Sequence, residues 1–138
     1  ARVSELARDI SEVIAAEPLE DCLARTAGGQ AIAFHSPCSL QHGQRITGVV
    51  ERLLEQAGYT LLPVADGHLC CGSAGTYSIL QPELSVKLRN NKLAALQAGE
   101  ATAIATANIG CLMHMSGHAK VPVRHWIELL EPLIPEAS

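Results

Sequence analysis

Aromatic and basic residues are both scarce in this chain. The 138 residues include one Phe, one Trp and two Tyr, too few to build stacking platforms for single-stranded nucleic acid. Charged residues make up only 17% of the sequence, the formal net charge is -4, and no block of Lys and Arg is present that could neutralise a phosphate backbone. We therefore expect no nucleic-acid partner.

The sequence also lacks an uninterrupted apolar run of membrane-spanning length. Its longest stretch without a charged residue, 101–119, is broken by Thr, Asn, Gly, His and Ser, so it predicts a strand, a loop and a helix and no transmembrane segment. No apolar secretory leader is visible at the N-terminus, which favours an intracellular, cytoplasmic protein. In that compartment five cysteines, an odd number, favour metal binding or redox chemistry over a disulfide framework.

Short apolar runs alternate with stretches of helical periodicity along the chain. The expected strands are 31–34, 59–64, 101–106 and 121–123, and the expected helices are 3–16, 46–57, 75–80, 82–99, 108–119 and 126–130. This alternation predicts an α/β fold, a small four-stranded, mostly parallel sheet with helices on both faces. Residues 1–29 are expected to form an N-terminal helix and linker packing on or leading into the domain, and residues 30–138 to form the domain itself.

Four of the five cysteines follow the end of a predicted strand. Cys38 comes after the first strand, Cys70 and Cys71 after the second, and Cys111 after the third. In a parallel sheet these ends share one edge, where open α/β folds bind ligands, so we expect one metal or iron-sulfur site there. Adjacent cysteines reach one site only if the backbone turns, which Gly72 permits.

Histidines offer further candidate donors to this site. Cys111 and His114 are three residues apart at the start of a predicted helix, which places both on one helix face. His35, His42 and His68 lie near the cysteines, and each could be a ligand or a hydrogen-bond donor to one. Three residues are left out of the site as structural or surface residues: Cys22, His118 and His125.

The segments HSPCSLQHG, HLCCGSAGTYSILQPELS and TANIGCLMH together resemble a known pattern. They are similar to the cysteine-rich CCG domain of heterodisulfide-reductase-like proteins, and most of all to the C-terminal domain of glycolate oxidase iron-sulfur subunits. That family has a Cys, a Cys-Cys-Gly and a Cys-x-x-Cys, and it holds an iron-sulfur centre. The resemblance implies that the ligands are Cys38, Cys70, Cys71 and Cys111, with Gly72 against the cofactor and His114 in place of the last cysteine.

The same resemblance implies a function. It predicts an electron-transfer domain with an iron-sulfur cluster of the 4Fe-4S type, in a complex that oxidises glycolate or another 2-hydroxy acid. Electrons would pass from a flavin-containing subunit towards a quinone, and this domain alone would carry no substrate chemistry. The implied partners are the flavin subunit and an N-terminal ferredoxin-like region of the full-length chain, at the inner face of the cell membrane through partner subunits.

Two other functions fit the cysteines without the resemblance. Cys and His together suit a structural zinc site that fixes loops and docks a partner subunit. Alternatively, Cys70 or Cys71 could act as a nucleophile or a redox dithiol with a nearby His as base, although this leaves Cys38 and Cys111 unexplained. No GxGxxG or Walker motif is present to suggest hydride or phosphoryl transfer.

Overall fold

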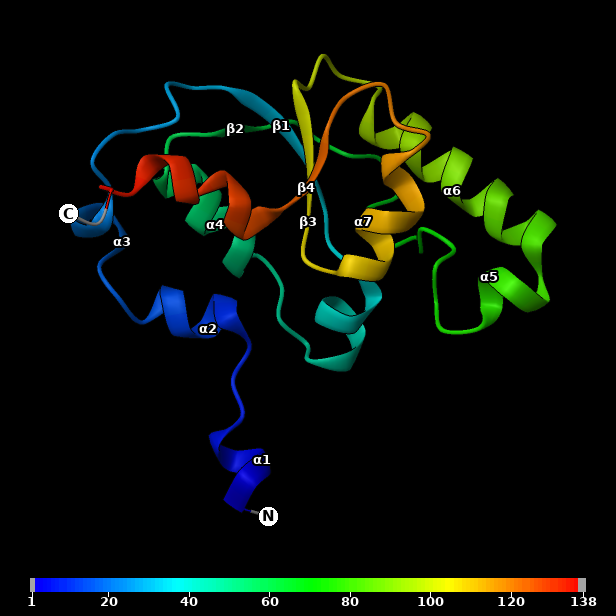
Figure 1. Ribbon diagram of the computed structural model, residues 1–138, viewed down its shortest axis with the longest axis horizontal. Helices are drawn as coiled ribbons and strands as arrows, with labels where there is room; N and C mark the ends of the chain where they lie inside the picture. The colour runs from blue at the N-terminus through cyan, green and yellow to red at the C-terminus, as the bar shows by residue number, and fades with distance from the viewer. Residues whose placement is uncertain (1, 137–138) are drawn as a thin grey trace.

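The computed structural model describes residues 2–136, and its centre is a four-stranded parallel sheet (Figure 1). The strands lie in the order β2-β1-β3-β4, and every neighbouring pair is parallel. Their bounds are β1 Ala31–His35, β2 Thr60–Leu61, β3 Ala103–Thr106 and β4 Val123–His125. The predicted α/β class, strand number and strand direction are confirmed.

One face of the sheet forms the first of two hydrophobic cores. Its side chains, among them Ile32 and Phe34 of β1, pack against α4 (Val49–Gln56) and the C-terminal 3-10 turns η2 (Trp126–Leu129) and η3 (Glu131–Leu133). The Tyr59 hydroxyl donates a hydrogen bond of 2.7 Å to the Leu129 carbonyl within this core. This link joins the beginning of β2 to the C-terminal turns.

The opposite face carries the second core and, with it, two of the cysteines. Ala33 and Ile104 point to this side, because side chains alternate along a strand. They pack against α6 (Pro82–Leu96) and α7 (Ile109–Ser116), which lie across the sheet from α4 in Figure 1. Cys71 and Cys111 are buried members of the same core. The candidate site is thus part of the packing of one sheet face.

All four strands differ from their predicted bounds: β1 gains His35, β3 begins at Ala103, and β2 and β4 change most. The expected strand 59–64 shortens to β2, whose last hydrogen bond to β1 runs from the Leu62 N–H to the Ile32 carbonyl, one residue before Pro63. The expected strand 121–123 is displaced to β4, since β3 begins only at Ala103 and Ile104 pairs with Val123. Residues 62–64, which were predicted to belong to the strand, are therefore part of the loop that carries Cys70 and Cys71.

The predicted single helix over 3–16 was wrong. The structure has α1 (Arg2–Leu6) and α2 (Ile10–Ala15), separated at Asp9. Asp9 caps α2: its carboxylate accepts from Ser11 N–H at 2.9 Å, and its own N–H donates to the Glu12 carboxylate at 2.8 Å. Of these two helices α2 packs against α4, whereas α1 extends away from the rest of the molecule (Figure 1).

The remaining helices are short, apart from α6. A linker helix α3 (Leu19–Cys22) and a π-helical turn η1 (Ser39–Gly43) were not predicted, and α5 (Tyr77–Leu80) precedes α6. The predicted last helix 126–130 is formed by the 3-10 turns η2 and η3 instead, because His125 and Glu128 cap η2 as a tight turn. Between residues 2 and 136, no helix combines the length and apolar character needed to cross a bilayer.

Candidate metal centre

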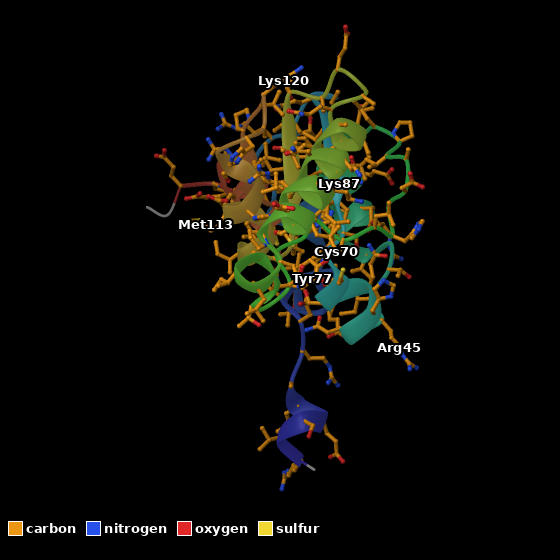
Figure 2. All side chains as sticks on the ribbon, turned by 90° about the vertical axis from the view of Figure 1, so that its right-hand side faces the viewer. Arg45, Cys70, Tyr77, Lys87, Met113 and Lys120 are labelled. Atoms are coloured by element: carbon orange, nitrogen blue, oxygen red, sulfur yellow. The ribbon has the colours of Figure 1, made fainter. Side chains whose placement is uncertain are left out.

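The loops that follow β1, β2 and β3 bring Cys38, Cys70, Cys71 and Cys111 together at one edge of the sheet. Cys38 immediately precedes η1, the cysteine pair lies within the loop between β2 and α5, and Cys111 lies in the first turn of α7. Figure 2, viewed from the side of α6, labels Cys70 in this region. The expected meeting of these residues is therefore present, and their role as ligands remains a prediction.

Cys71 and Cys111 are in direct contact. Their sulfur atoms are 3.0 Å apart, and the Ser73 hydroxyl lies 3.1 Å from the sulfur of Cys71 and 3.5 Å from that of Cys111. The position of Cys111 is fixed by Asn108, the N-cap of α7, whose side-chain oxygen accepts from the Cys111 N–H at 3.1 Å. The positive end of the helix dipole thus lies beside this thiol.

The two contacting thiols differ in acidity. The pKa of Cys71 is lowered chiefly by the hydrogen-bond contact between its sulfur and that of Cys111, which outweighs the opposing effect of burial. Ser73 acts in the same direction, as does the approach of the His35 ring, which does not reach hydrogen-bonding geometry. The pKa of Cys111 is raised, because its proton is held between the two sulfur atoms. Cys71 is the thiol prepared to bind a cation.

Cys38 and Cys70 form the more exposed half of the cluster. Both are partly buried, and with Cys111 they line a cavity of about 240 Å³. Burial raises the pKa of the Cys38 thiol, and the neighbouring Cys70 adds to this shift. Cys70 accepts a hydrogen bond from the Gly72 N–H at 3.3 Å. Three of the four thiols thus face one cavity at the sheet edge.

Gly72 allows the adjacent cysteines to serve one site. Its φ of +89° is unfavourable for a residue with a side chain, and a Cβ there would lie 2.6 Å from the Ser85 carbonyl oxygen. Ser85 also holds this glycine from α6, its hydroxyl donating to the Gly72 carbonyl at 2.7 Å. The Cys-Cys-Gly turn is therefore packed tightly against the first turn of α6.

The predicted ligand His114 lies next to this turn. Its Nε2 is 3.2 Å from the Ser85 hydroxyl, so the ring continues a chain of contacts from α7 through Ser85 to Gly72. His42, His68 and His118 are exposed, and His125 accepts from the Ile127 N–H at 3.4 Å. Ligation by His114 remains a prediction of the sequence, and the structure gives this ring a protein partner.

His35 is the histidine that groups with two of the thiols among the residues that the structure describes. It ends β1 with only 1% of its surface exposed, and one of its ring nitrogens and the sulfur atoms of Cys71 and Cys111 lie within 4.8 Å of one another. The sequence could not separate it from His42 and His68. The available signal was its spacing from Ala33, which turns both residues to the same sheet face.

Lys92 is a second residue that sequence reasoning missed. It lies in α6 with 3% of its surface exposed, and its ammonium donates to the carbonyls of Asp66 at 3.0 Å and Gly67 at 3.1 Å. Burial lowers the pKa of this ammonium, while the nearby Cys71 and Asp66 favour the charged form. No motif marks Lys92 in the sequence, because an isolated lysine in a helix predicts a solvated side chain.

The donors at this edge fit a bound metal or iron-sulfur cluster. Four thiols and one buried imidazole are soft to intermediate ligands, which suit iron-sulfur clusters and zinc. Within residues 2–136 neither ring nitrogen of His35 has a hydrogen-bond partner, so the nitrogen that could bind a cation is free. The Gly72 N–H on the Cys70 sulfur is the kind of contact that tunes cluster potentials.

A parallel sheet that presents a lone cysteine, a Cys-Cys-Gly turn and a helix-initiating cysteine at one edge defines a cysteine-rich domain of the metal-binding class. The family model described as "CCG: Cysteine-rich domain" matches residues 32–116. The chain belongs to this CCG cysteine-rich domain family, which confirms the resemblance seen in the sequence.

Curated relatives include iron-sulfur subunits of larger proteins. The chain is 50% identical over 130 residues to the glycolate oxidase iron-sulfur subunit of Escherichia coli (strain K12), covering 94% of this chain and 31% of that protein. It is 37% identical over 87 residues to the probable glycolate oxidase iron-sulfur subunit of Bacillus subtilis (strain 168), covering 62% and 20%. Lactate utilization protein A of Shouchella clausii (strain KSM-K16) is 31% identical over 103 residues, covering 70% and 43%. The chain thus spans less than half the length of each.

Proposed function

We propose that this domain holds an iron-sulfur cluster of the 4Fe-4S type through Cys38, Cys70, Cys71 and Cys111 and transfers electrons within an oxidoreductase complex. The observation that carries the proposal is the meeting of four thiols from three loops at one sheet edge. The relatives named as glycolate oxidase iron-sulfur subunits support the same cofactor. When bound, such a cluster supplies one-electron transfer.

The residues of this chain would hold the cluster and set its environment. Cys71 is acidified by its contact with Cys111, which favours the thiolate that binds iron. Gly72 supplies a backbone N–H to the sulfur of Cys70, and Lys92 places a buried positive charge beneath the preceding loop. Both features stabilise negative charge on the thiolates and on a reduced cluster.

The wider setting of the domain follows from its relatives and is part of the proposal. Their names refer to glycolate and lactate, so we propose a 2-hydroxy acid as the substrate of the complex, oxidised on a flavin-containing partner subunit. Electrons would pass through this chain towards a quinone. Residues 30–138 would form the cluster-binding unit, preceded by 1–29 and by a ferredoxin-like region of the longer chain, in a cytoplasmic complex peripheral to the membrane.

Zinc is the second candidate. The grouping of His35 with Cys71 and Cys111 within 4.8 Å offers the mixed nitrogen and sulfur donors of many zinc sites. In that case the centre would anchor the three loops and carry no electrons. The two candidates differ in sulfide, which only a cluster contains.

Anaerobic purification of the chain, followed by iron, sulfide and zinc analysis, tests the proposal. We expect iron and sulfide in about equal amounts, and a loss of most of both in Cys71→Ser, because Cys71 is the buried, acidified thiol. Cys22→Ser is the matched control: this exposed thiol in α3 lies outside the site and should leave the cluster unchanged. Zinc without sulfide in the wild type would support the second candidate and contradict the first.

A further inference from the structure

We infer that His35 is the nitrogen ligand of the centre, and that His114 is a positioning residue that holds the Cys-Cys-Gly turn. This inference rests on the proposed function, since it concerns how the same centre is held. It replaces the ligand expected from the sequence by a residue of another strand. Three separate observations on His35 and one on His114 carry it.

The first observation is the lack of any partner for the buried ring. His35 is 1% exposed, and neither of its ring nitrogens has a hydrogen-bond partner in the part of the chain that the structure describes. A neutral imidazole has one donor and one acceptor, and burying both without partners is destabilising. A cation bound at the acceptor nitrogen would satisfy the group that the protein leaves open.

The second observation is the direction of the side chain. Along β1 the residues Ile32 and Phe34 belong to the core under α4, so Ala33 and His35 point to the other face. That face holds Cys71 and Cys111. The register of β1 against β3 pairs His35 with Thr106, which shares its face.

The third observation is the location of the unpaired polar atoms. Over residues 2–136, the buried side-chain nitrogen and oxygen atoms without a hydrogen bond belong only to His35 and Thr106. These two are direct neighbours across the sheet, at the edge where the thiols gather. The Thr106 hydroxyl does not hydrogen-bond to the ring, so the unpaired polar atoms of both residues lie on the sheet face that carries the thiols.

The contacts of His114 indicate a supporting role and not ligation. Its Nε2 lies 3.2 Å from the Ser85 hydroxyl, which itself donates to the Gly72 carbonyl at 2.7 Å. The ring therefore has a protein partner, and it is connected to the Cys-Cys-Gly turn through Ser85 and Gly72. A histidine at this position supports the turn that carries Cys70 and Cys71, and the nitrogen donor comes from β1.

A neutral imidazole in the donor set has a chemical consequence. It carries less negative charge than a thiolate, so a centre with His35 as a ligand has a higher reduction potential than one held by thiolates alone. His35→Cys is therefore the informative variant. It keeps a metal-binding side chain at this residue while exchanging nitrogen for sulfur.

The test measures nitrogen coupling by pulsed EPR in protein labelled with ¹⁵N-histidine, with the centre poised in a paramagnetic state. We expect a strong histidine coupling in the wild type, its loss in His35→Cys with iron and sulfide retained, and a lower reduction potential in that variant. His114→Gln should keep the coupling. His42→Gln, at an exposed histidine near Cys38, is the control for the label.

Several outcomes would overturn the inference. A coupling that persists in His35→Cys, a coupling lost in His114→Gln with iron and sulfide retained, or a fully loaded wild type without coupling would each exclude His35 as the ligand. If His35→Cys does not fold, loss of the coupling in a fully loaded His114→Gln still excludes His35, and its retention excludes His114. A wild type that binds zinc and no sulfide contradicts the proposed cluster alone, because a zinc-bound nitrogen lost in His35→Cys, measured by X-ray absorption, would still support the ligand.

Discussion

Burying the ammonium of Lys92 carries a desolvation penalty, which interactions of its charge must offset. Its two hydrogen bonds go to the carbonyls of Asp66 and Gly67, in the loop that leads to Cys70. Lys92 also lines a small cavity with Cys70. A cation in this place both fixes the loop and stabilises negative charge on the thiolates.

We therefore predict that Lys92→Met lowers the reduction potential of the loaded centre, by on the order of tens of millivolts, because a nearby positive charge is removed. The variant also leaves two carbonyls without a donor, which should cost about 1–3 kcal/mol of unfolding free energy. A potentiometric titration and a denaturant melt measure the two effects. Lys87→Met, at an exposed position of the same helix labelled in Figure 2, should change neither. Equal potentials in wild type and Lys92→Met would contradict the electrostatic role.

Single residues of the site differ in how far the sequence could identify them. Cys38, Cys70, Cys71 and Cys111 could be found because each follows an apolar strand, and that pattern alone places them at one edge. His35 could not be distinguished from His42, because the difference between them is burial, which depends on packing by α6 and α7. Pairwise contacts such as that between His114 and Ser85 have no signature in the sequence at all.

At the scale of elements, α7 is the structure that delivers Cys111. Its N-cap Asn108 accepts from the Cys111 N–H at 3.1 Å, and its side-chain amide also donates to Ser39 at 3.3 Å, next to Cys38. The cap thus connects two of the loops that carry thiols. Asn108 therefore contributes both to the stability of α7 and to the geometry of the site.

We predict that Asn108→Ala destabilises the protein by about 0.5–2 kcal/mol, the usual effect of losing an N-cap side chain. It should also shorten the lifetime of the loaded centre, since the first turn of α7 then frays around Cys111. Asn108→Asp keeps an acceptor for the helix and should restore most of the stability. Thermal unfolding and the rate of iron loss to a chelator are the measurements. Iron loss as slow as in the wild type would show that the cap does not support the site.

The sequence predicted helices and strands correctly where the local spacing of apolar residues determines them. It failed where a capping residue or pairing with a neighbouring strand sets their bounds. The stripe over 46–57 appears as α4, and the apolar run at the first strand appears as β1 with the addition of His35. The helix over 3–16 failed because its apolar spacing continues through Asp9, whose capping contacts stop one helix and begin another. The strand over 121–123 shifted by two residues because its partners on β3, Ile104–Thr106, pair with Val123–His125.

At the scale of the whole molecule, strand order is what joins the thiols. The sequence predicted parallel strands and a common edge, yet the order β2-β1-β3-β4 follows only from how the crossovers pack. This order puts β1 between β2 and β3, so the loops that carry the cysteines leave three adjacent strands. The same order divides the interior into a core on the α4 side and a core that contains Cys71 and Cys111.

This division predicts how binding at the centre affects stability. A ligand that binds only the folded state stabilises it by mass action, and the stabilisation is felt where its ligands are packed. Loading should therefore slow amide hydrogen exchange in α6, α7 and the Cys-Cys-Gly turn, whose side chains share a core with Cys71 and Cys111, and change α4 much less. Hydrogen exchange with mass spectrometry on metal-free and loaded protein gives this comparison, with Cys71→Ser treated in the same way as the control. A protection increase of equal size on both sides of the sheet would mean that the two cores unfold as one unit, whereas protection confined to the α6 and α7 side would identify the centre as a local clamp on that face.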